Sequence, residues 1–597
     1  MRGLIVLALA LVASTAAAKP LLPGPADAGH DAALASKAGA MSRQIHAILN
    51  VPLGWGLEAY VPDKQARALI DAFIASGHHD LKTQSGKHAY ELVGRYSEHG
   101  DLGMFGGVQT AGDAFQYAVL RDGGADQADV DRARAALVAA MDGLHWYTAV
   151  TGEPGVMARG IRRAKSEPGE PPMPGVLPEL VPLFDGSGNP QPADKEPTWR
   201  ADRSGKLPFL IWFDDTSKDQ VDGYIFALGA VYDVVKDDTS IPADKVARLV
   251  ADARAIGLRL LEKVEVAPER FADLVLVDAD GRPTTFHDMS AEELAPGVVL
   301  GNAINGFNGW MGYSMLRTLF HISGDEAIGR RCRELLEERD YLNVISNTIV
   351  AMYVGEDTNF SNVNMAWVAA YGVLRYENDP EYAALARTIL ESRLYAPGVD
   401  RAPSGLGQSF FDFVYAAFKN GGAELGAGKQ ALERGIQTLS EHPSAPYWNP
   451  KVENCDAAEI KSLACKAADG TPIPLSAAPG WNGIVVAKAP VPMRLRPPTN
   501  FAWRSDPHGV NGGGGDRLNP GGGFHAAYWM ARFLELSSDG MTNVSPHART
   551  LPQLPTKPGD VPPTEAAMDE GCSCSVVAPG PSRSAWWLLL LGGLLWR

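Results

Sequence analysis

The densest group of residues able to do chemistry lies in residues 212–224, where acidic side chains surround the start of a predicted helix. Asp214 and Asp215 precede that start, and Asp219 and Asp222 follow it at a spacing of three, which places them on one helical face. Because crowded carboxylates repel one another, one of them can keep its proton near neutral pH and act as a general acid. We therefore expect Asp219, with Asp215 or Asp222, to form an acid/base pair.

Two other interpretations of this acidic segment stay open. Its hard carboxylate oxygens could bind Ca²⁺, although the segment lacks the Asp/Asn and Gly spacing of an EF-hand loop. Aspartates also favour the first turn of a helix through its dipole, without any function. Trp212, directly before the aspartates, is assigned to substrate binding. Apart from the calcium alternative, the sequence assigns no cofactor and no metal ligand.

A second loop, residues 355–367, concentrates amide side chains beside a tryptophan. Asn359, Asn362 and Asn364 offer donors and acceptors for sugar hydroxyl groups, and the indole offers an apolar plate for the ring. Ser361 or Asn362 could also cap a helix that begins near residue 363. The three asparagines together favour a ligand-binding surface.

The third group lies on a late predicted helix behind a glycine-rich loop. His525, Tyr528 and Arg532 step by three and four residues and share one face. We assign His525 and Tyr528 as candidate catalytic residues, and Trp529, Arg532 and the upstream Arg504 to substrate binding. Alternatively, the aromatic residues belong to the core and Arg532 pairs with an acidic neighbour.

Weaker candidates lie in two glycine-bounded segments, residues 106–113 and 151–160, which are predicted as loops beside helices. Their chemical members are Asp113 and Arg159, and His287 could add a base. The motifs of zinc hydrolases, α/β-hydrolases and dinucleotide-binding enzymes do not occur in their required context, which disfavours those classes.

Helical periodicity dominates the chain, and strand patterns are scarce and short. Apolar residues recur at helical steps in residues 130–147, 220–235, 244–264, 302–321, 326–338, 363–376, 382–393 and 523–536. Ser217 followed by Gln220 predicts a capping box, and Asp379-Pro380 predicts a break between two helices.

Paired helices without a fixed repeat leave two all-α architectures, an irregular α-solenoid or an (α/α) barrel, also called a toroid. We favour the toroid, as a single large domain with long loops. A solenoid would repeat visibly, and the candidate residues fall in loops before helices, where a toroid has its active face. Residues 164–206 and 440–500, rich in Pro, Gly and Ser, are predicted as excursions from this domain.

The two ends of the chain predict export. Residues 1–18 show the charged, apolar and small-residue regions of a secretory signal peptide, with cleavage after Ala18. Residues 571–597 contain Cys572 and Cys574, a small-residue spacer, a short apolar run and a final arginine. At ~1.5 Å per residue this run falls well short of the ~30 Å hydrocarbon core of a bilayer. The order resembles the myxobacterial C-terminal sorting signal (MYXO-CTERM), which implies that a cysteine is the processing site.

Four segments follow from these patterns: a signal peptide at 1–18, a helical domain at 19–550, a Pro-rich stalk at 551–570 and a sorting segment at 571–597. We expect the protein at the cell surface, held to the envelope membrane through its processed tail. Its partners would be the export and sorting machinery and a glycan.

The composition excludes further classes. The net charge of −16 argues against nucleic acid as a partner, because phosphate binding needs a basic face. With 5 cysteines in 597 residues, disulfides do not build the fold. Cys455 and Cys465 could close one bridge, whereas Cys332 is predicted as a buried thiol.

The preferred hypothesis is a surface-displayed enzyme that acts on a carbohydrate. Its architecture loosely resembles helical toroid glycosidases and polysaccharide lyases without matching their motifs residue by residue. Hydrolysis would use the aspartate pair. Elimination from a uronate would use His525 or Tyr528 as the base, with Asn362 and Arg532 on the carboxylate. The alternative is a non-catalytic binding or adhesion scaffold. Convergence of Asp219 with Asn362, Tyr528 and Arg532 in one pocket would favour catalysis.

Overall fold

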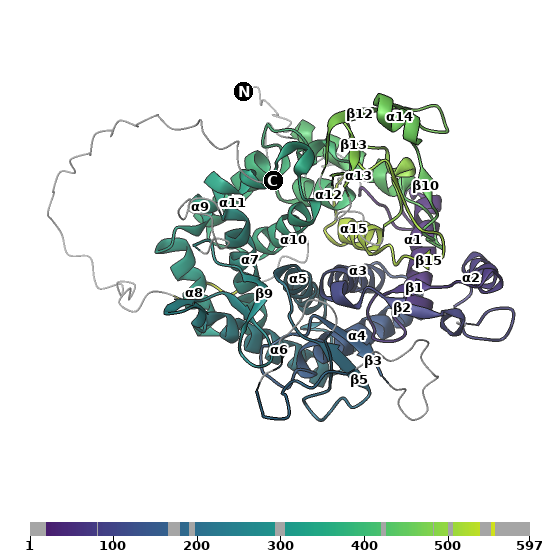
Figure 1. The fold of residues 1–597 in the computed structure, drawn as a ribbon. Helices are drawn as coiled ribbons and strands as arrows, with labels where there is room; N and C mark the ends of the chain where they lie inside the picture. The colour runs from purple at the N-terminus through teal and green to yellow at the C-terminus, as the bar shows by residue number, and fades with distance from the viewer. Residues whose placement is uncertain are drawn as a thin grey trace, which may run out of the picture. The chain divides into compact units, whose positions relative to one another are not determined.

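The computed structural model describes residues 20–79, 82–164, 180–189, 191, 198–292, 305–419, 425–480, 483–499, 506–537 and 551–555. Within these ranges helices predominate, as the sequence predicts (Figure 1). Strands are short and form small antiparallel sheets of two or three members, which the all-α prediction lacks. One compact unit extends as far as Pro555.

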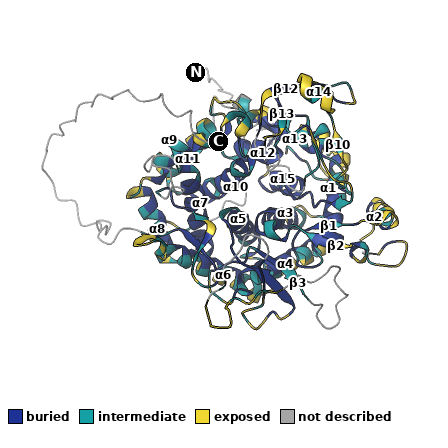
Figure 2. Cartoon of the chain, viewed as in Figure 1, coloured by how far each residue is buried: buried dark blue, intermediate teal, exposed yellow. Residues whose placement is uncertain are grey.

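Six helices are buried along most of their length. They are α3 (Leu102–Asp122), α5 (Lys218–Val235), α7 (Gly306–Ser323), α10 (Phe360–Tyr376), α12 (Ser409–Phe418) and α15 (Gly522–Phe533). In this order each contacts the next, and α15 contacts α3 again. Figure 2 shows them as the dark blue centre of the helical unit.

A second set of helices alternates with the buried set along the chain. It comprises α1 (Ala32–Gln44), α4 (Gln127–Ala149), α6 (Ala243–Leu261), α8 (Glu326–Glu337), α11 (Pro380–Ile389) and α13 (Leu425–Glu441). The helix α6 is typical: it buries Leu249, Ala253, Ile256 and Leu260 at steps of three and four and leaves the opposite face in water. In Figure 1 these helices surround α3, α5, α10 and α15.

Three further α-helices in the described residues belong to neither set. They are α2 (Lys64–Ser76), α9 (Tyr341–Thr348) and α14 (Ala457–Ser462). Wider π-helical turns at Ile45–Leu49 and Leu390–Tyr395 extend α1 and α11.

The prediction of a loop at residues 106–113 is wrong, because this segment is the middle of α3. Its glycines serve close helix packing. A Cβ at Gly107 would lie 2.2 Å from the Gly223 carbonyl oxygen of α5, and a Cβ at Gly112 would lie 2.5 Å from the His525 ring of α15. Only glycine lets these helices approach so closely.

The helix boundaries confirm some capping predictions and correct others. Each of the eight periodic segments overlaps a helix in its described residues, and Asp379 caps α11 with Pro380 as its first residue. The capping box at Ser217 does not form, because the Ser217 hydroxyl donates to Asp219 instead. The helix α10 begins earlier than predicted, at Phe360, and Asn359 is its cap.

The short sheets lie between the helices in sequence. They are β1 (Glu58–Tyr60), β2 (Arg95–Ser97) and β15 (Arg517–Leu518); β3 (Gly160–Arg163), β5 (Leu210–Phe213) and β4 (Trp199–Ala201); β6 (Val264–Ala267) and β7 (Arg270–Ala272); β8 (Val275–Val277) and β9 (Pro283–Asp288); β10 (Val452–Glu453) and β14 (Asn511–Gly512); and β11 (Ala464–Lys466), β12 (Pro472–Pro479) and β13 (Val485–Ala487). In the first sheet Tyr60 pairs with Arg517 and Glu58 pairs with Ser97, which brings distant segments together.

Residues 440–480 and 483–499 form a small excursion with its own apolar cluster, which contains Cys455, Cys465 and Ile473. The two cysteines are bonded as a disulfide. Cys332 is a buried free thiol on α8, as predicted.

Residues 551–555, predicted as the start of the stalk, pack against the helical unit. Arg333 donates to the Leu554 and Pro555 carbonyl oxygens, and the Leu554 side chain is buried. The rest of the predicted stalk, both termini with Ala18, Cys572 and Cys574, and also Arg504, lie outside the described residues. No helix in the described ranges has the length and apolar character needed to cross a bilayer.

Candidate functional site

The first turns of α3 and α5 bring two carboxyl groups together. Asp219 accepts hydrogen bonds from the Ser217 hydroxyl and, at 2.9 Å, from Gln220 Nε2. The same amide nitrogen lies 3.3 Å from Oδ1 of Asp101, the residue that precedes α3. Gln220 is itself fixed, because its Oε1 accepts the Met104 backbone N–H at 3.0 Å. One buried amide therefore bridges carboxyl groups from two helices.

A cation approaches the same group from the loop before β3. Arg159 Nη1 donates to Ser217 Oγ at 3.0 Å and to the Asp215 carbonyl oxygen at 3.3 Å. The Arg159 carbonyl oxygen in turn accepts a hydrogen bond from the Tyr147 hydroxyl at 2.7 Å. Arg159 is a weak candidate from the sequence alone. In the structure it donates a hydrogen bond to Ser217, which in turn donates to Asp219.

The first turn of α7 joins through Lys218. Its Nζ donates to Asn308 Oδ1 at 2.8 Å and lies 5.4 Å from the centre of the Phe307 ring. Burial lowers the pKa of Lys218, and the charges of Asp288 and Asp219 oppose that shift. The lysine thus adds a confined positive charge beside Asp219 and connects the starts of two buried helices.

A third carboxyl group comes from strand β1. Glu58 is 4% exposed, and Arg517 on the neighbouring strand β15 donates to its Oε2 at 2.6 Å. Burial, with the nearby charges of Glu98 and Asp101, raises the pKa of Glu58 to about 7, although Arg517 acts in the opposite direction. Glu58 can therefore hold its proton near neutral pH.

Glu58 opens into a pocket of about 200 Å³. The lining residues are Glu58, Glu98, Asn449, Pro498, Thr499, Arg517 and Asn519. Because Asp101 acts on the pKa of Glu58 and also shares Gln220 with Asp219, it connects this pocket to the start of α5. We refer to Glu58, Glu98, Asp101 and Asp219 as the carboxyl cluster.

The other aspartates of the predicted segment serve the fold. Asp214 is buried 3.5 Å from Arg200, and burial with the charge of Asp278 raises its pKa to about 6. Both oxygens of Asp215 accept hydrogen bonds from Thr285 on β9, at 2.6 Å and 2.8 Å. Neither carboxylate is directed at Asp219.

Asp222 is buried in a small space between α5, α7 and α10. Burial first, and the charge of Asp219 second, raise its pKa well above the usual value. Its environment favours a neutral carboxyl group. Asp222 does share the helical face of Asp219, as the spacing predicts, but the space beside it, about 10 Å³, is too small to hold a sugar.

Most of the residues assigned to sugar binding also serve the fold. Trp212 is fully buried in β5, and its indole N–H donates to the Ala201 carbonyl oxygen at 3.0 Å. Asn359 is the cap of α10, and Asn364 is buried. Asn362 is half-buried in the first turn of α10, and it remains accessible. Trp212 therefore has no face to offer to a ligand.

The predicted residues of the late helix α15 are buried or contact groups other than Asp219. The His525 side chain is fully buried, and Tyr528 is buried with its pKa raised by that burial. Trp529 is buried, and the Arg532 guanidinium lies 5.3 Å from its ring centre. Arg532 also lies near Gly24, at the N-terminal segment. The structure thus does not bring these residues to the first turn of α5.

The calcium alternative finds no common centre in these aspartates, since their carboxylates bond to different partners. In the part of the chain that the structure describes, the side chains placed closely enough to hold a metal are His46, Asp113 and His525. This group includes none of the predicted aspartates.

Sequence reasoning missed Glu58, Glu98, Asp101 and Arg517 because they come from segments far apart in the chain. A usable signal existed at Glu58, a single charged residue in the apolar and glycine-rich run of residues 53–61. Such a residue in an otherwise buried strand is a functional candidate.

No protein-family model, curated protein or solved structure matches this chain. The function therefore has to be argued from the geometry of the carboxyl cluster.

Proposed function

We propose that the protein is a carbohydrate-active hydrolase whose active site is the carboxyl cluster. The observation that carries this proposal is Glu58, a buried carboxyl group with a pKa of about 7 that opens into a pocket beside further carboxyl groups. Hydrolysis of a glycosidic bond requires such a pair, one group protonated and one able to accept a proton.

In this proposal Glu58 donates its proton to the oxygen of the leaving sugar. Asp219 is the partner that activates water or stabilises the developing positive charge on the ring. Both oxygens of Asp219 accept hydrogen bonds, which is the pattern of a carboxylate. Arg517 and Arg159 orient the two carboxyl groups through the contacts described above.

Hydrolysis is favoured over elimination because of where the bases lie. Elimination needs a base that a substrate can reach. His525 and Tyr528 are buried, and neither lines the pocket beside Glu58. The carboxyl cluster, in contrast, is half-exposed at Asp101, Asp219 and Glu98.

The helix arrangement supports an (α/α) barrel as the architecture of this enzyme. The six buried helices contact one another in a closed order, and the half-buried helices alternate with them along the chain. Asp101, Asp219 and Asn308 all lie at the starts of buried helices, where a barrel of this kind would place its active face.

The test is a screen of purified protein against polysaccharides, with detection of new reducing ends and of absorbance from an unsaturated uronate. Asp219→Asn should lower turnover by about 10²–10⁴-fold while the melting temperature stays nearly unchanged. The matched control is Asp252→Asn, which removes a buried carboxyl group with a raised pKa on α6 and should leave turnover intact. Normal turnover in the Asp219 variant would exclude Asp219 from the mechanism.

A second candidate is a non-catalytic surface protein that binds a glycan or serves as an adhesion scaffold. It is favoured by the separate contacts of the predicted residues, since Asp219 bonds to Ser217 and Gln220. Arg532 instead lies against Trp529. Glycan binding without any new reducing end or unsaturated product would select this candidate.

Both candidates share a proposed location. The sequence of both ends supports export and display at the cell envelope, with a glycan as the ligand. Mass spectrometry of the C-terminal tail tests this location.

A further inference from the structure

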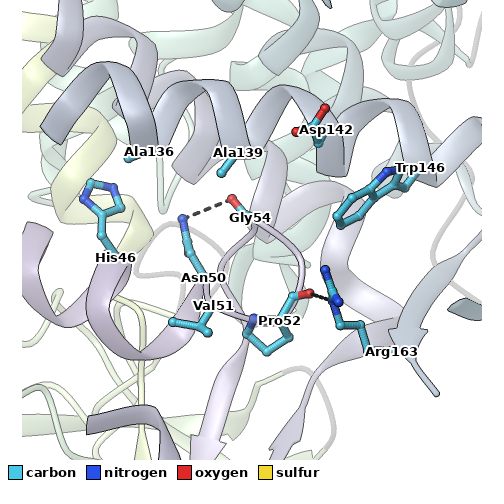
Figure 3. A pocket seen from close by; sticks show the side chains of 10 residues that line it. All are labelled: His46, Asn50, Val51, Pro52, Gly54, Ala136, Ala139, Asp142, Trp146 and Arg163. Atoms are coloured by element: carbon cyan, nitrogen blue, oxygen red, sulfur yellow. Dashed lines mark hydrogen bonds between the residues drawn. The ribbon is translucent and has the colours of Figure 1, made fainter. Parts of the chain in front are cut away.

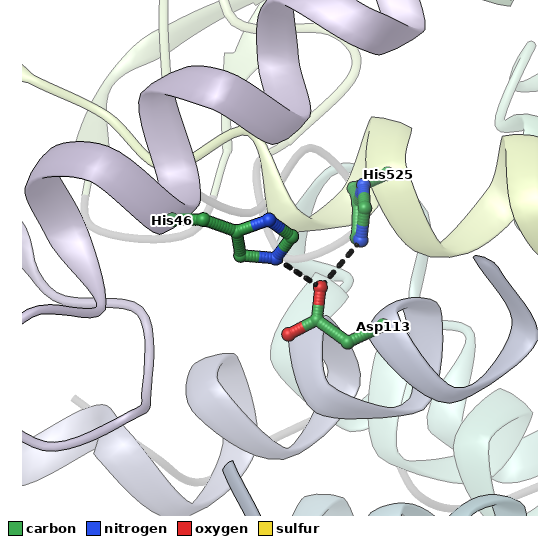
Figure 4. A group of neighbouring side chains, drawn as sticks. All are labelled: His46, Asp113 and His525. Carbon is green, nitrogen blue, oxygen red and sulfur yellow. Dashed lines mark hydrogen bonds and ion pairs between the residues drawn. The ribbon is translucent and has the colours of Figure 1, made fainter. Parts of the chain in front are cut away.

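Three side chains from distant parts of the chain converge on one point (Figure 4). His46 comes from the π-helical turn after α1, Asp113 from the middle of α3 and His525 from α15. Nε2 of each histidine lies 2.8 Å from the same atom, Oδ1 of Asp113. The three ligand atoms lie within 4.8 Å of one another.

The fold holds this group rigidly on two sides. Asp113 and His525 are buried, and the His525 ring packs directly against the glycine at position 112. The His46 ring meets the His525 ring edge-on, with centres 6.1 Å apart. His46 is 23% exposed and is therefore the member with room to adjust.

The hydrogen-bonding pattern points beyond a structural clamp. Both imidazoles are directed at one oxygen of Asp113, whereas its buried Oδ2 has no hydrogen-bond partner among the described residues. A clamp built only from hydrogen bonds would be expected to use both oxygens, because an unpaired buried oxygen is costly. Two imidazole nitrogens and one carboxylate oxygen are instead a common ligand set for a divalent transition metal.

We propose that His46, Asp113 and His525 bind one divalent transition-metal ion, with Zn²⁺ as the best-suited ion. Metal–nitrogen bonds of about 2.0–2.1 Å require the two histidine nitrogens, each now 2.8 Å from Oδ1 of Asp113, to move away from that oxygen and gather with it around the ion. Three protein ligands leave a fourth position for water or a small ligand.

Access to this position is available through His46. His46 lines a pocket of about 280 Å³ together with Asn50, Asp142, Trp146 and Arg163 (Figure 3). Asn50 and Arg163 are tied to the backbone of this pocket, at the Gly54 and Pro52 carbonyl oxygens. The pocket opens to His46 but is not lined by Asp113 or His525, so a metal ion would enter past the His46 ring.

The experiment uses the purified protein after treatment with EDTA and dialysis. Addition of Co²⁺ should produce the visible absorption of a site with nitrogen and oxygen ligands, and Zn²⁺ should displace it at one equivalent per chain. Zn²⁺ should also raise the melting temperature. In His46→Ala the affinity for Zn²⁺ should fall at least tenfold, with an unchanged circular dichroism spectrum.

The matched control is His145→Ala. His145 is also partly exposed and pairs with an aspartate, Asp252, at 2.9 Å, but among the described residues it belongs to no group of three metal-ligating side chains. This variant should bind Zn²⁺ as the wild type does. Absence of the Co²⁺ spectrum and of Zn²⁺ stabilisation in the wild type would overturn the proposal and leave the group as a hydrogen-bonded clamp. Equal loss in both variants would overturn it as well.

Discussion

Glu58 is the residue on which the proposed hydrolysis depends most, and its environment explains why. Its neighbours Leu57 and Ala59 are fully buried, so the strand carries the carboxyl group into a region of low polarity. A proton is retained there that an exposed glutamate would lose. The same burial makes the ionised form costly to the folded state, which links the proposed catalysis to stability.

The first prediction concerns Glu58→Gln. The pKa of Glu58 is raised in the folded protein from 4.5 to about 7, so its stabilising contribution is fully present below pH 4.5 and is lost as the pH rises through about 7. Glutamine stays neutral throughout. The melting temperature of the variant relative to wild type should therefore rise between pH 5 and pH 8, while turnover falls at least about 100-fold.

Melting curves at several pH values, with turnover measured on the same samples, check this prediction. Wild-type turnover should decline above about pH 7, where Glu58 loses its proton. A constant difference in melting temperature between variant and wild type across this range would show that Glu58 titrates normally.

At the scale of elements, glycine contacts decide how closely α3 lies against α5. A Cβ at Gly107 would be 2.2 Å from the Gly223 carbonyl oxygen, so Gly107→Ala should cost about 3 kcal/mol of unfolding free energy through forced separation of the helices. The matched control is Gly39→Ala on α1, where the nearest atom lies 3.7 Å away. It should stabilise the protein by about 0.5–1 kcal/mol.

Urea unfolding of the two variants measures both effects. The same displacement of α3 should disturb the bridge between Asp101 and Asp219, since Gln220, next to Asp219 on α5, reaches Asp101 across this helix interface. Equal stability of the two glycine variants would contradict the packing argument.

These contacts also show why part of the fold was open to sequence reasoning. The spacing of apolar residues predicts amphipathic helices such as α6, and Asp379-Pro380 predicts a helix start. The helix α3 could not be predicted in this way. Its glycines allow close contact with neighbouring helices, but in the sequence they suggest a turn. The carboxyl cluster was only partly predictable for a similar reason. Asp219 belongs to a local pattern, whereas Glu58 becomes notable only once the chain has folded.

At the scale of the whole molecule, the helical unit ends later than its composition indicates. Arg317 is fully buried and donates to the Pro552 carbonyl oxygen, and Arg333 donates to those of Leu554 and Pro555. A chain of residues 19–555 should therefore unfold like the full-length protein. A chain of residues 19–550 should lose about 2 kcal/mol, because it loses the burial of Leu554 and the carbonyl acceptors of Arg317 and Arg333. Identical melting temperatures for the two chains would show that these contacts carry no stability.

The last prediction concerns the tail. If Cys572 or Cys574 is the processing site, mature protein should lack the apolar segment yet remain with the cell envelope. The apolar run is too short for a stable span, so it would hold the protein only until processing. Replacement of both cysteines with serine should leave the tail uncleaved and the protein misplaced. The helical unit, which extends to Pro555, should melt as in the wild type. The single variants identify which cysteine is processed. Mass spectrometry of the envelope fraction decides the matter, since an intact Arg597 terminus on correctly displayed wild-type protein would refute processing.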